Sequence, residues 1–240
     1  MTTVLLLPGW LDSGPTHWQS RWEATHPFTR VQQHDWQRPL RGDWVARLEE
    51  VVVNHVASFA ADDNSLLKSE LLPQCNIDRQ PDSFIKNSAT ASEIAAVPAH
   101  AQRSIVLVAH SLGCHLVAAW AAASRHTSAI RGALLVAAPD LTREDLPSNL
   151  YSWRKPVMNP LPFPATCVVS SNDPFGSLAA GHSMAAAWGA RCLHAGPLGH
   201  INGDSGLGDW PAGYAMLTEL TRLTPLTAPS EPKKDAPHGH

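Results

Sequence analysis

The stretch that decides the fold reads Ile105-Val106-Leu107-Val108-Ala109-His110-Ser111-Leu112-Gly113, and an alanine-rich segment follows it. Residues 105–109 form a continuous apolar run, which is typical of a strand buried on both faces of a parallel sheet. Residues 112–123 favour a helix that can pack closely on such a sheet. Ser111 therefore lies on a sharp turn between a strand and a helix.

The residues that flank Ser111 are small where such a turn requires it. In a nucleophile elbow the strand and the helix approach closely, so the side chains two residues before and two after the serine must be small. Ala109 takes the first position, where glycine is commoner, and Gly113 takes the second. The alternative is a serine that only caps the helix. The strand–turn–helix order favours a catalytic nucleophile.

Apolar runs alternate with helical patterns along the rest of the chain, which predicts a parallel sheet with helices on both faces. Further strands are expected at residues 4–7, 30–33, 133–137, 166–170 and 191–194. Further helices are expected after a cap at Asp43, at residues 177–188, and from Pro211 to a stop at Pro225. Together they predict an α/β-hydrolase fold, a single three-layer α/β domain with a mostly parallel sheet of about six strands.

Two stretches fall outside this alternation. Residues 62–100 are polar and irregular, and we expect a partly disordered surface insertion within a hydrolase domain that spans residues 1–224. Residues 225–240 are rich in proline, lysine and aspartate and predict a disordered tail. The closing His238-Gly239-His240 is a conceivable metal-binding end, but the composition favours a tail without such a site.

Length and composition narrow the class of protein. The 240 residues suffice for one domain with a real core, and 44% of them are hydrophobic. The net charge is -3, so the chain has no excess of basic residues and we expect no nucleic-acid partner. The start lacks a basic segment and no apolar run approaches the ~20 residues of a membrane span. These features predict a cytoplasmic protein with no membrane partner.

The cysteines show no metal or disulfide pattern. Cys75, Cys114, Cys167 and Cys192 have no paired short spacing. We therefore expect reduced thiols, no metal site and no cofactor, which agrees with a cytoplasmic location.

A serine nucleophile needs a base, and position must choose it among 13 histidines. In this fold the chain order is serine, acid, histidine, and the histidine lies on a loop after the last strand. Only His200, in Gly199-His200-Ile201-Asn202, lies in such a loop. His194 falls within a strand and His182 on a helix, so packed or surface rings are expected there. His110 and His115 are expected to support the turn.

Two aspartates compete for the acid that orients His200. Asp173 follows the strand at residues 166–170, and Asp140 follows the strand before it. Both strand ends face the site in this fold. Asp173 lies on the strand nearer the His200 loop and is therefore favoured, which leaves Asp140 as a supporting or helix-capping carboxylate.

An oxyanion hole needs two backbone donors. The Leu112 N–H lies at a helix N-terminus, where unpaired donors favour negative charge. The second donor is expected from the loop after the first strand, where Gly9 permits close approach of the backbone. We assign it to the Trp10 N–H, with Leu11 as the alternative. An ordinary glycine-containing turn is the other interpretation of this loop.

Residues 141–164 join two strands at the same edge and predict a short loop that covers the site. The loop carries Tyr151, Trp153, Met158 and Phe163 between prolines, and these side chains could equally pack on the sheet. A chain of this length has no room for a large cap domain. We therefore expect a fairly open site for small esters or amides.

A set of short motifs spans most of residues 3–223 and is specific in its order: Pro8-Gly9-Trp10, Ser13-Gly14-Pro15, His17-Trp18-Gln19, Gln33-His34-Asp35-Trp36, Val108-Ala109-His110-Ser111-Leu112-Gly113-Cys114, Val136-Ala137-Ala138-Pro139-Asp140, Ser170-Ser171-Asn172-Asp173-Pro174, Gly199-His200-Ile201-Asn202, Ser205-Gly206 and Trp210-Pro211. In these motifs the chain resembles the retinoblastoma-binding-protein-9/YdeN family of small serine hydrolases. Residues 62–100 depart from the family pattern in being longer.

The resemblance implies an α/β-hydrolase domain without a metal or organic cofactor. Carried onto matching positions, it implies a triad of Ser111, Asp173 and His200. It also implies a small-molecule ester or amide substrate. Binding to the retinoblastoma protein is not carried over, because no binding motif for it is matched.

The sequence thus predicts a serine hydrolase that works through an acyl-enzyme on Ser111. Acyl transfer to another acceptor and peptidase action use the same triad and stay open. A non-catalytic binding module that kept the fold is the alternative from another class, although all three triad residues are present.

Overall fold

The protein is built around one parallel sheet. The computed structural model describes residues 2–70 and 104–222, with side chains left out for residues 62–70. The sheet has six strands in the order β2-β1-β3-β4-β5-β6, and every neighbouring pair is parallel. Its strands are β1 (Thr2–Leu7), β2 (Thr29–Arg30), β3 (Ser104–His110), β4 (Ile130–Val136), β5 (Ala165–Val169) and β6 (Arg191–His194). This is the predicted α/β-hydrolase fold.

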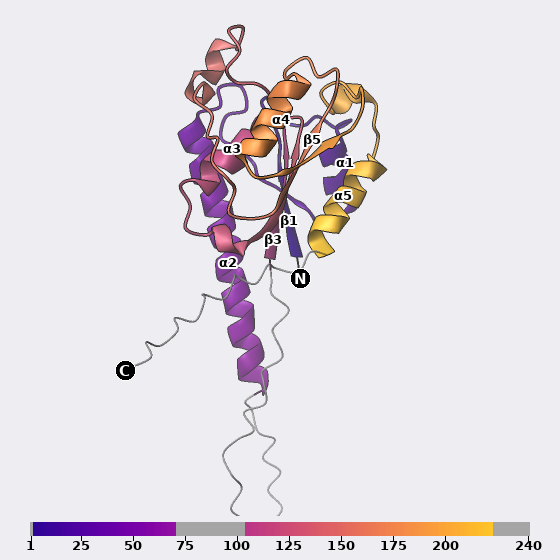
Figure 1. Ribbon diagram of the computed structural model, residues 1–240. Coiled ribbons are helices and arrows are strands. Elements are labelled where there is room, and N and C mark those ends of the chain that lie inside the picture. Colours follow the sequence, from indigo (N-terminus) through magenta and orange to yellow (C-terminus); the bar gives the residue numbers. More distant parts are fainter. Residues whose placement is uncertain (1, 71–103, 223–240) are drawn as a thin grey trace, which may run out of the picture.

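Helices cover both faces of the sheet (Figure 1). The α-helices are α1 (Trp18–Thr25), α2 (Arg41–Glu70), α3 (Leu112–Ala121), α4 (Leu178–Ala187) and α5 (Pro211–Arg222). Three short 3-10 helices lie in the connections, at Thr127–Ala129, Ser148–Trp153 and Gly203–Ser205. In Figure 1, α2, α3 and α4 lie on one side of the strands and α1 and α5 on the other.

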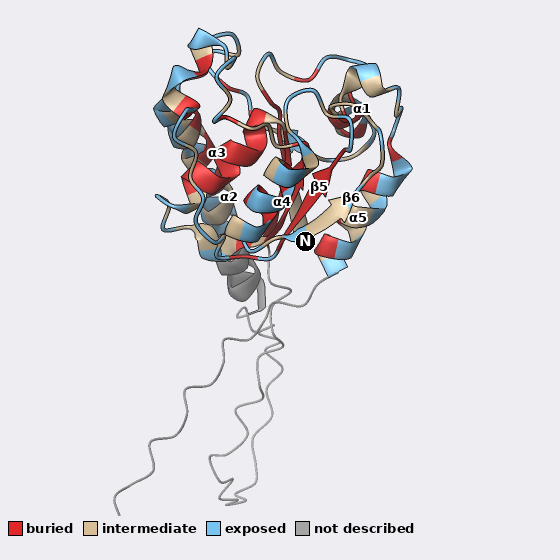
Figure 2. Ribbon diagram, turned by 45° about the horizontal axis from the view of Figure 1, so that its top comes forward, coloured by how far each residue is buried: buried red, intermediate tan, exposed pale blue. Residues whose placement is uncertain are grey.

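Alternation along the strands creates two hydrophobic cores. Leu5 and Leu107 face the core that α2, α3 and α4 cover, whereas Leu6 and Val108 face the core beneath α1 and α5. Figure 2 shows the central strands buried between these layers, whereas the edge strand β6 is only partly buried. Burial of each such side chain contributes about 1.5–3 kcal/mol, so the sheet is held from both faces.

The predicted elements are confirmed, with shifts at their ends. β2 is a two-residue edge strand, shorter than the expected run at 30–33. α2 begins at Arg41, so Asp43 lies in its first turn and does not cap it. α2 also continues to Glu70, so the start of the stretch at 62–100 is helical and not irregular. Residues 71–103 and the tail at 225–240 lie outside the described residues.

The loops after the strands meet at one edge of the sheet. The turn after β3, the loop after β1 and the loops after β5 and β6 all lie there, because the strands are parallel. No helix among the described residues is long and apolar enough to cross a membrane.

Candidate active site

Ser111 occupies the turn between β3 and α3 in a left-handed conformation. Its φ is 54° and its ψ is -125°, which is an unfavourable backbone geometry for a residue with a side chain. The Ser111 N–H donates to the Val136 carbonyl at 2.9 Å, which ties the turn to the end of β4. The strained turn lifts the side chain out of the β3–α3 path, as a nucleophile elbow does.

Two glycines let the first loop pack against this turn. A Cβ at Gly9 would come 2.6 Å from the Ser111 Cβ, and a Cβ at Gly113 would come 2.3 Å from the Leu7 carbonyl oxygen. Real Cβ atoms do not approach so closely, so each position requires glycine. Ala109 is fully buried in β3 and fits without glycine.

The structure brings Ser111, His200 and Asp173 together. His200 Nε2 lies 2.9 Å from Ser111 Oγ, and His200 Nδ1 lies 3.0 and 2.9 Å from the two oxygens of Asp173. A carboxylate only accepts, so Nδ1 carries the proton and Nε2 is left to accept from the serine hydroxyl. The Asp173 side chain is 4% exposed and that of His200 10%. Both ring nitrogens of His200 are thereby used within this group.

Asp140, the alternative acid, makes other contacts. Its Oδ1 accepts from the Thr142 N–H at 2.9 Å and from the Thr142 hydroxyl at 2.6 Å. This closes a local turn after β4 and leaves the carboxylate facing the adjoining cavity. Of the two strand-end aspartates, Asp173 is the one bonded to His200.

The loop after β5 also holds the backbone of the His200 loop. Asn172 Oδ1 accepts from the Gly199 N–H at 2.7 Å, and Ser170 Oγ accepts from the Leu198 N–H at 3.0 Å. The sequence analysis did not assign these two positions a role. Their place in Ser170-Ser171-Asn172-Asp173 is the signal, because short polar side chains at a strand end readily bond to neighbouring backbone.

Two buried rings hold the backbone of the His200 loop by hydrogen bonds. His110 Nε2 donates to the His200 carbonyl at 2.9 Å, and Trp18 Nε1 donates to the Ile201 carbonyl at 2.8 Å. Burial lowers the pKa of His110 well below its usual value, so the ring stays neutral. His110 therefore supports the His200 loop and not only the turn. Trp18 was not predicted, since its partner is far away in sequence.

Two backbone N–H groups near the serine are candidates for the expected oxyanion hole. Leu112 is the first residue of α3, so its N–H has no acceptor within the helix. The Leu11 N–H already donates to the Trp36 carbonyl at 3.1 Å. Among the described residues, the Trp10 N–H has no such partner. The geometry thus favours Trp10 over Leu11 as the second donor.

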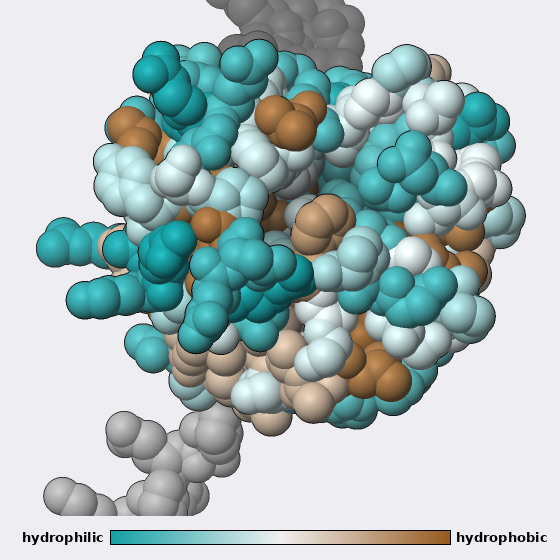
Figure 3. All heavy atoms as spheres, turned by 90° about the horizontal axis from the view of Figure 1, so that it is seen from above, coloured by the Kyte–Doolittle hydropathy of each residue, from teal (hydrophilic) through white to brown (hydrophobic). Residues whose placement is uncertain are grey.

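An apolar cavity of about 440 Å³ opens beside Ser111. Leu141, Leu146 and Leu150 come from the connection after β4, and Phe175 comes from the loop after β5. Phe175 also packs edge-on against the His200 ring, with centroids 4.6 Å apart. Figure 3 looks down on this edge and shows hydrophobic residues around a recess. The connection therefore covers the site in part, as expected, although Trp153 is buried and Tyr151 points to solvent.

A second, polar hollow of about 260 Å³ lies on the other side of the serine. Ser111, His200 and Asp12 line both spaces, and the polar one adds Thr16, His17 and Asp204. Burial lowers the pKa of His17, at the floor of this hollow, to about 3. The serine thus separates an apolar space from a polar one.

Four other histidines have varied partners. His115 Nε2 donates to the Pro139 carbonyl at 2.8 Å, and burial lowers its pKa to about 4. His126 Nδ1 bonds to Glu49 at 2.8 Å. His182 and His194, expected to be unremarkable, contact each other.

Comparison with known proteins places the chain in a family. A family model described as serine hydrolase matches residues 4–59 and 65–219. Among solved structures, a protein described as a YdeN-like hydrolase from Pectobacterium atrosepticum is 23% identical, with a TM-score of 0.62 over 92% of this chain and 91% of that one. The ydeN gene product of B. subtilis is 16% identical, with a TM-score of 0.54 over 92% and 99%.

A more distant esterase shares the fold. This Rhodococcus enzyme is 12% identical, with a TM-score of 0.53 over 93% of this chain and 91% of that one. A search of curated proteins gave no match. The family match extends over most of the chain, and the six-stranded parallel sheet agrees with the solved structures. The chain belongs to the serine hydrolase family.

Proposed function

We propose that the protein hydrolyses small carboxylic esters or amides through an acyl-enzyme on Ser111. The observation that carries the proposal is the continuous chain of short contacts from Asp173 through His200 to Ser111 Oγ. A serine hydroxyl becomes a useful nucleophile when an adjacent base takes its proton, and a third group orients that base. All three parts are present within hydrogen-bond distance.

In the first half of the reaction, Ser111 Oγ attacks the carbonyl carbon of the substrate. His200 Nε2 takes the hydroxyl proton and passes it to the leaving alcohol or amine. Asp173 keeps the Nδ1 proton in place and stabilises the ring while it is charged. The carbonyl oxygen becomes an oxyanion, which we expect the N–H groups of Trp10 and Leu112 to bind.

In the second half, water replaces the leaving group. His200 Nε2 takes a proton from that water, and the resulting hydroxide attacks the acyl carbon bound to Ser111. Collapse of the second oxyanion breaks the bond to Oγ, which receives the proton back from His200. The products are a carboxylic acid and the free enzyme.

The two spaces beside Ser111 support a division of the substrate. The leucine-lined cavity fits an apolar acyl group of modest size, since its volume is about 440 Å³. The polar hollow, with Thr16, Asn202 and Asp204 in its lining, suits a polar leaving group that is not anionic. We therefore expect uncharged esters with an apolar acyl chain to be preferred over substrates with an anionic leaving group.

The proposal is tested with a fluorophosphonate probe and a panel of p-nitrophenyl esters. The wild-type protein should be labelled and should hydrolyse at least one ester, and Ser111→Ala should do neither. Ser124→Ala is the matched control, because Ser124 follows the C-terminal end of α3 and its hydroxyl donates to Glu49. Equal labelling of wild type and Ser111→Ala would refute the assignment. Absence of both labelling and turnover in the wild type would favour a binding module.

A further inference from the structure

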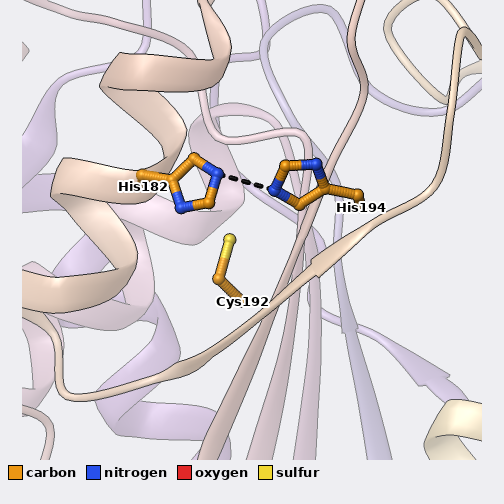
Figure 4. Close-up of side chains that lie close together, drawn as sticks. All are labelled: His182, Cys192 and His194. Atoms are coloured by element: carbon orange, nitrogen blue, oxygen red, sulfur yellow. Dashed lines mark hydrogen bonds between the residues drawn. The ribbon is translucent and has the colours of Figure 1, made fainter.

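A cluster of metal-ligand side chains lies apart from Ser111, on the α4 side of the sheet. It consists of His182 from α4 and of Cys192 and His194 from β6 (Figure 4). One potential ligand atom from each residue lies within 4.8 Å of the other two. The Nε2 atoms of the two rings are 2.6 Å apart. The described residues contain no other such group.

The fold explains why these three side chains meet. Cys192 and His194 are two residues apart on a strand, so their side chains leave the same face of the sheet. Cys192 packs against the core beneath α2, α3 and α4, which fixes that face as the one that α4 covers. β6 is the edge strand, paired only with β5. His182 extends from α4 over this edge, where the cluster meets solvent.

We propose that His182, Cys192 and His194 form a binding site for a thiophilic divalent cation of the Zn²⁺ type. Two imidazoles and one thiolate are ligands that zinc prefers, and three protein ligands leave a fourth tetrahedral position for water or an external ligand. Hard cations such as Mg²⁺ and Ca²⁺ are excluded, because they require oxygen ligands.

The separations suit such an ion after small side-chain rotations. Tetrahedral zinc at ordinary bond lengths places two nitrogens about 3.3 Å apart and a nitrogen and a sulfur about 3.6 Å apart. The two Nε2 atoms, now at 2.6 Å, would open by less than an ångström. The sulfur separations, at most 4.8 Å, would close by about an ångström. Both histidines are exposed, so their rings are free to adjust.

Binding of Zn²⁺ at this site would release one proton. Zn²⁺ forms one bond to Sγ and one to an Nε2 of each neutral ring, and the thiol proton of Cys192 goes to solvent. Burial raises the pKa of the Cys192 thiol above its usual value, so the metal-free thiol holds this proton at neutral pH.

A shared proton between the two rings is the competing explanation of their contact. One neutral ring can donate to the other, and that pair needs no metal. Such a pair makes no use of the Cys192 sulfur, which in Figure 4 points toward both rings. The sulfur is what distinguishes a metal site from a hydrogen-bonded pair.

The test is a Co²⁺ titration of the full chain after treatment with a chelator. Co²⁺ is a coloured substitute for Zn²⁺, and a bound thiolate gives a charge-transfer band in the near ultraviolet. We expect this band to saturate at one equivalent and to disappear when Zn²⁺ is added. In a separate melt, Zn²⁺ at a hundredfold excess over its Kd should raise Tm by about 5 °C.

Variants distinguish this site from other binding. Cys192→Ser should abolish the charge-transfer band, and His182→Gln should lower the affinity at least tenfold. Two controls should bind as the wild type does: His34→Ala, an exposed histidine elsewhere, and His238→Ala/His240→Ala in the tail. A band that persists in both Cys192→Ser and His182→Gln would overturn the proposal. So would loss of binding in the tail variant alone, or a wild-type protein without any band.

Discussion

The loops after β4 and β5 begin alike and end in different roles. Each leaves a parallel strand at the same edge and carries an aspartate, Asp140 or Asp173, close to Ser111. Asp140 bonds to Thr142 in its own loop, whereas Asp173 bonds to His200 on the loop after β6. The difference teaches that, in this molecule, the carboxylate bonded to His200 comes from the strand that lies next to β6 in the sheet.

The largest expected effect comes from exchanging each carboxylate for an amide. Asp173→Asn should lower kcat by about 10³- to 10⁴-fold, because the amide no longer fixes the His200 tautomer. Asp140→Asn should change kcat by less than about threefold, since it acts within its own turn. Steady-state kinetics on one ester measures both. Equal losses in the two variants would break the distinction between the loops.

The next effect concerns how the loop after β5 holds the His200 backbone. Asn172→Ala removes the acceptor of the Gly199 N–H and should lower kcat roughly 10- to 100-fold, because His200 loses its exact placement. Thr142→Val removes a comparable bond in the loop after β4 and should leave kcat unchanged. Circular dichroism serves as the folding control. If Thr142→Val lowers kcat as much as Asn172→Ala, the two loops act alike.

Acid should lower the free energy of unfolding through His115, the buried ring that bonds to the Pro139 carbonyl in the loop after β4. This ring is held neutral with a pKa of about 4, whereas it titrates near 6.5 when unfolded. Between these values the unfolded chain binds more protons, so the free energy of unfolding falls as the pH falls. His115 should account for about 2 kcal/mol of the loss between pH 7 and pH 5.

Denaturant unfolding at the two pH values checks this expectation. His115→Gln keeps a donor for the Pro139 carbonyl and cannot titrate, so the loss should shrink by about the same 2 kcal/mol. His34→Gln is the control, because that residue is exposed. If the free energy of unfolding of His115→Gln falls as much between pH 7 and pH 5 as that of the wild type, another group causes the acid sensitivity. His17 and His110 are the next buried rings to test.

The smallest effect concerns specificity, which we assign to the connection after β4. Leu146→Trp fills part of the apolar cavity and should lower kcat/KM about tenfold for a long-chain ester relative to an acetate ester. The rate on acetate should stay near the wild-type value, because Asp173 and His200 are untouched. A uniform loss across chain lengths would show that this connection serves catalysis and not selection.

The fold was predictable because its signals are local. The apolar run at 105–109, the small residues at 109 and 113, and the alternation of strands and helices all act over a few residues. Ser111, Asp173 and His200 followed from their positions along the chain. Their catalytic roles stay predictions, although the structure brings the three side chains together.

Other features depend on contacts between segments far apart in sequence. The bonds from Trp18 and His110 to the His200 loop join three segments, and no spacing along the chain encodes them. The meeting of His182 with Cys192 and His194 likewise needs the packing of α4 on β6. The β2 strand was overestimated, because Thr29 and Arg30 alone pair with β1 at the sheet edge.

The absence of a side chain at Gly9 has a consequence for the timing of catalysis. The loop after β1 packs directly against the turn at Ser111, and Gly113 lets the start of α3 pack against the carbonyl of Leu7. We therefore expect the two candidate oxyanion donors to be in position before any substrate binds, with little reorganisation left for the reaction itself. Free and inhibitor-bound forms should superpose at these backbone atoms, and turnover should need no loop closure to complete the anion site.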